Sequence, residues 1–127
     1  MDTNGNWSFI TVRFHETDIV TFDHFTKFIL NPYIITNEYY AIAIEHKDTS
    51  ERHLHAVIKN TTSRDNDKVK QKVKNFVNSK KNNIWNTITD NAVDVKPLKS
   101  NLDIYSTIGY IAKQSKTDLQ SNILDGS

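Results

Sequence analysis

The sequence predicts an α+β fold, with helices packed on one face of an antiparallel sheet in a ferredoxin-like or RRM-like arrangement. Several short segments alternate apolar and polar residues as half-buried strands do, and the segments between them carry apolar residues at helical spacing. With 127 residues, 37% hydrophobic and 24% charged, the chain fits one globular domain with one core. We therefore expect a single domain over 1–127, with flexible ends at about 1–6 and 116–127.

Four segments are predicted as strands because β-branched and aromatic residues are frequent in them and polar residues bound them. In the first, alternation directs Ile10, Val12 and Phe14 to the core. The opposite face of the same strand carries Phe9, Thr11 and Arg13. The strands are expected at about residues 7–14, 39–46, 53–59 and 92–97, with a polar turn at 47–52 joining the second and third.

Three helices are expected between and after these strands. Thr21 can cap the first, which ends at Asn31-Pro32. The second, near 66–78, presents valines on one side and lysines on the other. Ser100 followed by Asp103 resembles a capping box and opens a third helix that runs to about Lys113.

The composition excludes several classes of protein. The absence of cysteine removes disulfides, thiolate nucleophiles and zinc–thiolate sites. The first residues lack the basic and apolar regions of a signal peptide, and no apolar stretch is long enough to span a bilayer. We therefore expect an intracellular protein with no membrane partner.

Positive charge is concentrated in one part of the chain. Residues 59–81 hold eight basic and two acidic side chains, whereas residues 1–58 hold four basic and eight acidic ones. Such a cluster can follow a phosphate backbone, although a solvated lysine-rich helix face explains it equally well. The candidate nucleic-acid contacts in the predicted second helix are Lys68, Lys70, Lys72 and Lys74.

His53-Leu54-His55 is the most specific feature of the sequence. On a strand, both imidazoles point to one face. The position of Glu45 differs from that of each histidine by an even number, so antiparallel pairing across the 47–52 turn keeps its carboxylate on the same face. Two imidazoles and one carboxylate form a credible Mg²⁺, Mn²⁺ or Zn²⁺ site. The simpler interpretation is that the histidines line an exposed sheet face.

A second candidate is the pair formed by Tyr110 and Lys113, which are three residues apart on a predicted helix and share one face. A tyrosine hydroxyl can attack phosphorus and form a reversible phosphotyrosyl ester. The lysine can orient the phosphate or stabilise the developing charge. Without other support, a tyrosine at helical spacing more often packs in a core.

Three motifs together resemble the replication initiator (Rep) endonuclease domain of circular single-stranded DNA viruses, a member of the HUH superfamily. The segment Phe9–Phe14 is similar to the first family motif, and His53–Val57 to the metal motif, with Glu45 at the position of the third ligand. Tyr110–Lys113 matches the Tyr-x-x-Lys of the catalytic helix. The sequence holds a single Tyr-x-x-Lys motif, which argues against the relatives that use two tyrosines, although a secondary role for Tyr105 stays open. The metal motif has two histidines rather than three, which argues against a conjugative relaxase.

The resemblance implies site-specific nicking and joining of single-stranded or hairpin origin DNA for rolling-circle replication. It implies a tyrosine nucleophile, here Tyr110, a 5′-phosphotyrosyl intermediate, and Mg²⁺ or Mn²⁺ as cofactor. Phe9 and Arg13 are expected to contact the DNA by stacking and phosphate attraction. It further implies a helicase domain in the full-length protein and, for a eukaryotic virus, the host nucleus as location, and it leaves oligomerisation open.

The rival hypothesis is a non-catalytic module that binds single-stranded nucleic acid on an RRM-like sheet. Such a module accounts for Phe9 and the basic helix. It gives no role to the Glu45, His53 and His55 group or to the Tyr110 and Lys113 pair.

Overall fold

A computed structural model of the chain describes residues 5–15, 39–45, 53–60, 66–79, 86–114 and 119–121. The predicted helix between Thr21 and Asn31 and the 47–52 turn lie outside these residues. No helix within the described ranges is long and apolar enough to span a membrane. The elements are β1 (Asn6–Arg13), β2 (Tyr39–Glu45), β3 (His53–Asn60), α2 (Asn66–Val77), the 3₁₀ turn η1 (Asp90–Ala92), β4 (Val93–Leu98), α3 (Asn101–Gln114) and β5 (Leu119–Ser121).

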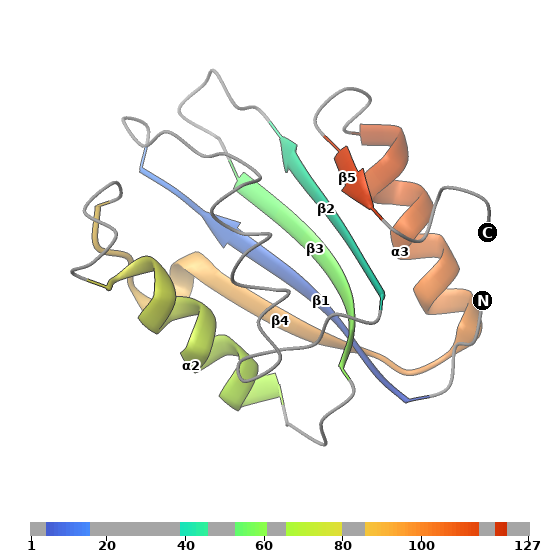
Figure 1. Cartoon of the computed structure of the whole chain (residues 1–127), viewed down its shortest axis with the longest axis horizontal. Helices are drawn as coiled ribbons and strands as arrows, with labels where there is room; N and C mark the ends of the chain where they lie inside the picture. The colour runs from blue at the N-terminus through green and yellow to red at the C-terminus, as the bar shows by residue number, and fades with distance from the viewer. Residues whose placement is uncertain are drawn as a thin grey trace.

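The described strands form one five-stranded sheet in the order β4-β1-β3-β2-β5, with β3 at its centre (Figure 1). Every neighbouring pair is antiparallel. The predicted α+β class with an antiparallel sheet is therefore confirmed, and each of the four predicted strands begins within one residue of its expected start. The fifth strand was not predicted: β5 pairs with β2 inside the stretch at 116–127 that was expected to be a flexible end.

One face of the sheet carries the larger core. Alternation in β1 places Ile10 and Val12 on this face, as predicted, and alternation in β3 adds Leu54 and Ile58; all four are buried. Helix α2 covers them with the valines of its apolar side, while its lysines are exposed or partly buried outside this apolar side. Each fully buried Val, Leu or Ile side chain contributes about 1.5–3 kcal/mol through the hydrophobic effect, so this layer holds α2 on the sheet. The helical valines of this core are Val69, Val73 and Val77.

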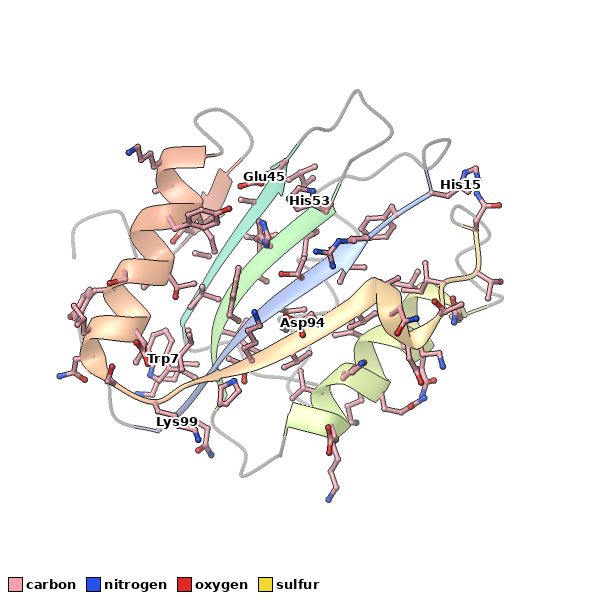
Figure 2. The ribbon with its side chains drawn as sticks, turned by 180° about the vertical axis from the view of Figure 1, so that it is seen from behind. Trp7, His15, Glu45, His53, Asp94 and Lys99 are labelled. Atoms are coloured by element: carbon pink, nitrogen blue, oxygen red, sulfur yellow. The ribbon has the colours of Figure 1, made fainter. Side chains whose placement is uncertain are left out.

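Helix α3 packs on the opposite face, which corrects the expectation that the helices share one face. Its buried side consists of Ile104, Ile108 and Ile111. These isoleucines contact the alanines of β2, Ala41 and Ala43, whose small side chains leave room for a helix to lie close to the strand. The apolar side of α3 must pack against another apolar surface, and because α2 already covers the first face of the sheet, α3 packs on the second. Figure 2 shows α3 lying along the β2 side of this second face.

The start of α3 follows the predicted cap. The Asp103 backbone N–H donates to the Ser100 hydroxyl at 3.1 Å, which satisfies one of the unpaired donors of the first helical turn. The helix then continues through Gly109, and a Cβ built at that position meets nothing within 4 Å. The glycine therefore has no steric role within the described part of the fold.

We predict that Gly109→Ala stabilises the protein. Glycine inside a helix is about 0.8–1.0 kcal/mol less favourable than alanine, and the added methyl group enters open space. For a domain of this size we expect Tm to rise by roughly 2–6 °C in a thermal unfolding experiment followed by circular dichroism.

Gly5→Ala is the matched control, because Gly5 has a φ of 99° and its Cβ would lie 3.1 Å from Lys59 Cε. That substitution should lower Tm. A lower Tm for Gly109→Ala would contradict the placement of Gly109 on an open helix face.

Candidate metal centre

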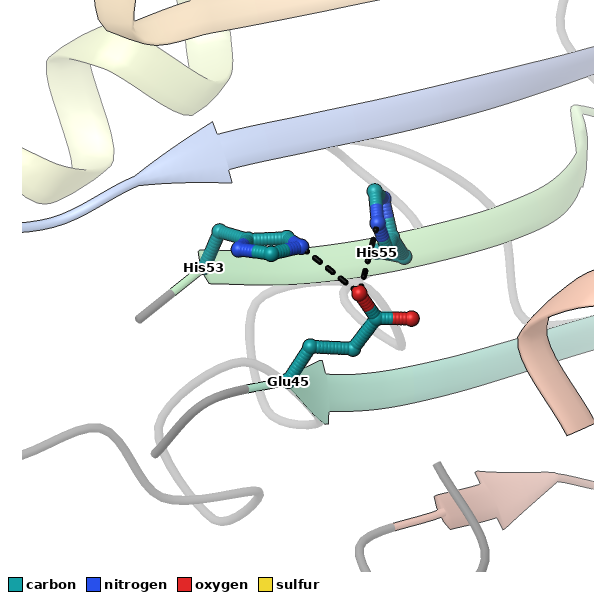
Figure 3. A group of neighbouring side chains, drawn as sticks. All are labelled: Glu45, His53 and His55. Atoms are coloured by element: carbon teal, nitrogen blue, oxygen red, sulfur yellow. Dashed lines mark hydrogen bonds and ion pairs between the residues drawn. The ribbon is translucent and has the colours of Figure 1, made fainter. Parts of the chain in front are cut away.

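Strand pairing brings Glu45 and His53 face to face. In the β2–β3 register Glu45 lies directly opposite His53, which is one of the two pairings that the even spacing allowed. His55 follows two residues later on β3, so its side chain emerges on the same face. The expected clustering of the three side chains is confirmed (Figure 3).

The potential ligand atoms of the three residues converge on one point. Glu45 Oε2 lies 2.8 Å from His53 Nε2 and 3.5 Å from His55 Nε2. One ligand atom from each side chain can be chosen such that all lie within 4.8 Å of one another. Two ring nitrogens and a carboxylate oxygen at this spacing can hold a metal ion.

The carboxylate of Glu45 also carries an unsatisfied atom. Its side chain is only 8% exposed, and Oε1 is buried without a hydrogen-bond partner among the described residues. A buried acceptor left without a donor costs about 1–3 kcal/mol. The oxygen that faces both histidines is Oε2, so an ion in this group would satisfy Oε1 as well only if Glu45 bound it through both oxygens. The fit to an ion therefore rests on the donor set itself, one carboxylate and two imidazoles.

The environment of His55 keeps its ring neutral at physiological pH. Burial lowers the pKa of His55 to about 4, and the positive charges of His53 and Arg13 act in the same direction, while the Glu45 carboxylate opposes the shift. A neutral imidazole has a free lone pair on one ring nitrogen, as a metal ligand must. The second ring nitrogen, Nδ1, lies 3.0 Å from the hydroxyl oxygen of Thr11.

Alternation in β1 predicts that Thr11 lies on this face, but nothing in the sequence predicts a role for it. The structure pairs Thr11 directly with His55 across the β1–β3 ladder. The signal that would have found this contact is the register between the first and third strands. No turn in the sequence sets that register, because the two strands are far apart in the chain.

Helix α3 brings Tyr110 to the Glu45–His53–His55 group, the candidate metal centre, which is called the metal centre from here on. Its ring packs edge-on against His55, with ring centroids 6.1 Å apart and an angle of 69° between the planes. Tyr110 remains 49% exposed, so it contacts the site while staying accessible from solvent. Phe9 packs on the same histidine at 5.1 Å. Tyr110 and Phe9, both predicted as site residues, thus contact the same histidine ring.

Tyr105 and Lys113 take different positions on α3. Tyr105 is 51% exposed, but five residues separate it from Tyr110, which turns it by about 140° around the helix axis. It therefore points away from the side of α3 that contacts His55. Lys113 is exposed in the last turn, one turn beyond Tyr110 and on the same side of the helix.

The lysines of α2 do not adjoin the metal centre. Helix α2 covers the face of the sheet opposite Glu45 and His55, and Lys74 forms an ion pair with Asp90 at 2.7 Å. Of the predicted nucleic-acid contacts, Phe9 and Arg13 share the face of the metal centre. The four α2 lysines, Lys68, Lys70, Lys72 and Lys74, belong to a separate surface.

Lys96 is an additional basic residue on the face of the metal centre. The β1–β4 register places it opposite Phe9, and its side chain is 67% exposed. Figure 2 shows its partner Asp94 on the same strand, on the face that carries Glu45 and His53. Lys96 was not predicted as a site residue because nothing in the sequence indicates that the fourth strand pairs with the first.

Comparisons with known proteins identify no relative. No protein-family model matches the chain, and no curated protein or solved structure is significantly similar to it. The proposals below therefore depend on the site and on the motifs.

We predict that Mn²⁺ raises Tm of the wild-type protein and leaves Tm of Glu45→Gln unchanged. Ligand binding to the folded state stabilises it by about 2.7 kcal/mol at a concentration one hundred times Kd. Loss of the carboxylate removes the charged ligand of the group. His15→Ala is the matched control because His15 is an exposed histidine outside the group, and it should respond to Mn²⁺ like the wild type. An equal Mn²⁺ response in Glu45→Gln would contradict the assigned ligands.

The lowered pKa of His55 predicts a pH dependence of stability in the metal-free protein. Below the ordinary pKa of 6.5 the unfolded chain takes up a proton that the buried ring does not accept until about pH 4, so stability is lost across that interval. The full shift corresponds to about 3 kcal/mol. Urea unfolding between pH 4 and 8 with EDTA present should show that His55→Gln loses stability less steeply than the wild type. Identical slopes would contradict the burial of a neutral His55.

Proposed function

We propose that this domain is a metal-dependent endonuclease that nicks and rejoins single-stranded DNA, with Tyr110 as the nucleophile. The observation that carries the proposal is the contact between Tyr110 and His55. It places a solvent-accessible hydroxyl-bearing side chain beside a group that can hold a metal ion. A structural metal site needs no such neighbour.

The proposed ion is Mg²⁺ or Mn²⁺, on the strength of the motifs that resemble viral Rep domains. Glu45 supplies a hard oxygen ligand that suits either ion, whereas the two imidazoles of His53 and His55 would suit Zn²⁺ as well. When bound, the ion would act as a Lewis acid on a phosphoryl oxygen. Because Glu45 and His55 are buried and Tyr110 is half exposed, the solvent side of the group is where a phosphate can approach.

Tyr110 then carries the bond exchange. Its hydroxyl oxygen attacks the scissile phosphorus and forms a 5′-phosphotyrosyl ester, while the bond from phosphorus to the 3′ oxygen breaks. The tyrosine hydroxyl loses one proton and the departing 3′ oxygen takes one up, so the exchange is balanced and leaves a free 3′-OH. Since one phosphodiester is exchanged for another, the reaction can run backwards and join strands. Lys113, on the same side of α3, orients the phosphate and stabilises its charge.

The open part of the metal-centre face supports a single-stranded substrate. Phe9 offers a ring on which a base can stack, and Arg13 offers positive charge four residues further along β1 on the same face. Lys96 lies opposite Phe9 on β4, where its charge is shared with Asp94 at 3.7 Å. The α2 lysines lie on the other face, where they are suited to a separate duplex or flanking segment of the origin. We place the reaction in rolling-circle replication, with a helicase domain acting after the nick, on the strength of the motifs that resemble viral Rep domains.

A covalent-adduct assay tests the function. The protein is incubated with Mn²⁺ and a pool of single-stranded and hairpin-loop oligonucleotides of random sequence, and the products are run on a denaturing gel. A 3′ label should migrate with the protein, because the phosphotyrosyl bond retains the downstream fragment. A 5′ label should appear in shorter free fragments that a polymerase can extend.

Two tyrosine variants sharpen this experiment. Tyr110→Phe should abolish the adduct, whereas Tyr105→Phe removes the hydroxyl of a similarly exposed tyrosine on the same helix and should leave the adduct intact. An adduct that survives Tyr110→Phe contradicts the proposal. Binding of the pool without any adduct, weakened by Phe9→Ala, would instead favour a non-catalytic single-strand binding module.

A further inference from the structure

We infer that Thr11 is a positioning residue whose hydroxyl reverses its hydrogen bond with His55 when a metal ion binds, and so allows the His55 ring to change tautomer. The inference rests on the metal-binding part of the proposed function. It adds to that function a residue on β1, outside the three ligands, that controls whether His55 can act as a ligand.

The geometry comes from the two nitrogens of the His55 ring. Nδ1 lies 3.0 Å from the Thr11 hydroxyl oxygen, and Nε2 lies 3.5 Å from Glu45 Oε2. Thr11 and His55 are buried, with 6% and 7% of their surfaces exposed. The contact is thus shielded from water, and the ring lies between a hydroxyl on one strand and a carboxylate on another.

The surroundings hold the ring in this orientation. Thr11 faces His55 across the β1–β3 ladder, so the two backbones fix the distance between the side chains. Phe9 packs against the ring at 5.1 Å and His53 at 4.7 Å. Nδ1 therefore stays directed at Thr11, and Nε2 at the point where the ligand atoms converge.

The proton on a neutral imidazole can sit on either nitrogen, and each choice demands a different partner. Without an ion, the Glu45 carboxylate can only accept, which favours the proton on Nε2, and the Thr11 hydroxyl then donates to Nδ1. With an ion on Nε2, the proton must sit on Nδ1, and the Thr11 hydroxyl must accept it. A hydroxyl can take both roles because its hydrogen rotates.

Removal of the hydroxyl should therefore weaken metal binding in particular. In Thr11→Val the metal-bound state would leave a buried Nδ1–H without an acceptor, a loss of the kind that costs 10–100-fold in metal affinity when such partners are mutated. Thr11→Ser keeps the hydroxyl and should bind metal like the wild type. Valine retains the β-branched shape, and its Tm in EDTA shows whether the fold is intact.

Isothermal titration with Mn²⁺, without DNA, measures the expected effect. We expect Kd to rise by about 10–100-fold in Thr11→Val and to be near the wild-type value in Thr11→Ser. Equal affinities for the valine variant and the wild type would overturn the inference while leaving the metal site intact. Failure of the wild type to bind Mn²⁺ would overturn both. If Thr11→Val binds Mn²⁺ more weakly and the wild type forms no DNA adduct, the inference is supported and only the nuclease function is refuted.

The tautomer itself can be read from long-range ¹H–¹⁵N spectra of the histidine rings, with diamagnetic Mg²⁺ as the probe. We expect the His55 proton on Nε2 in the metal-free wild type and on Nδ1 at Mg²⁺ saturation. A ring that keeps one tautomer throughout a titration to saturation would contradict the reversal. The same spectra of Thr11→Val should show the change of tautomer only at a higher Mg²⁺ concentration than in the wild type, whereas a merely structural threonine would leave the midpoint of that change where it is.

Discussion

The register between β2 and β3 is the constraint on which the rest of this structure depends. It sets Glu45 opposite His53 and leaves His55 on the same face two residues later. A slip of one residue would move Glu45 to the other face of the sheet, among the side chains that α2 covers. The buried alternating residues of both strands, such as Ile44 and Leu54, oppose that slip because it would expose them. The hydrophobic core thus fixes the ligand geometry.

The second constraint is the difference in side-chain size between the two faces of the sheet. Large aliphatic side chains fill the α2 face, whereas β2 carries Ala41 and Ala43 on the other. These small residues let α3 lie close to the sheet, and the helix reaches the metal centre with Tyr110. A bulkier side chain at either alanine would push α3 outward and separate the tyrosine from His55. The packing that stabilises the fold also determines the distance between candidate nucleophile and candidate ion.

Local pattern was sufficient to predict four of the five described strands, the cap at Ser100 and the Glu45–His53–His55 group, because each depends on alternation or on residues close in the chain. Long-range pairing was not predictable. The β1–β4 and β1–β3 registers bring Lys96 and Thr11 to the site, and no turn chemistry encodes them. For the same reason we expected all the helices on one face of the sheet, because the apolar side of a helix does not specify which face it covers.

The central claim is that Glu45, His53 and His55 bind one divalent ion beside Tyr110. The most direct test is a crystal structure of the protein with Mn²⁺, using anomalous diffraction to locate the metal. We expect one strong peak bonded to Nε2 of both histidines and to the Glu45 carboxylate, with its open side toward Tyr110. A peak held by other residues, or none at this group at saturating Mn²⁺, would contradict it.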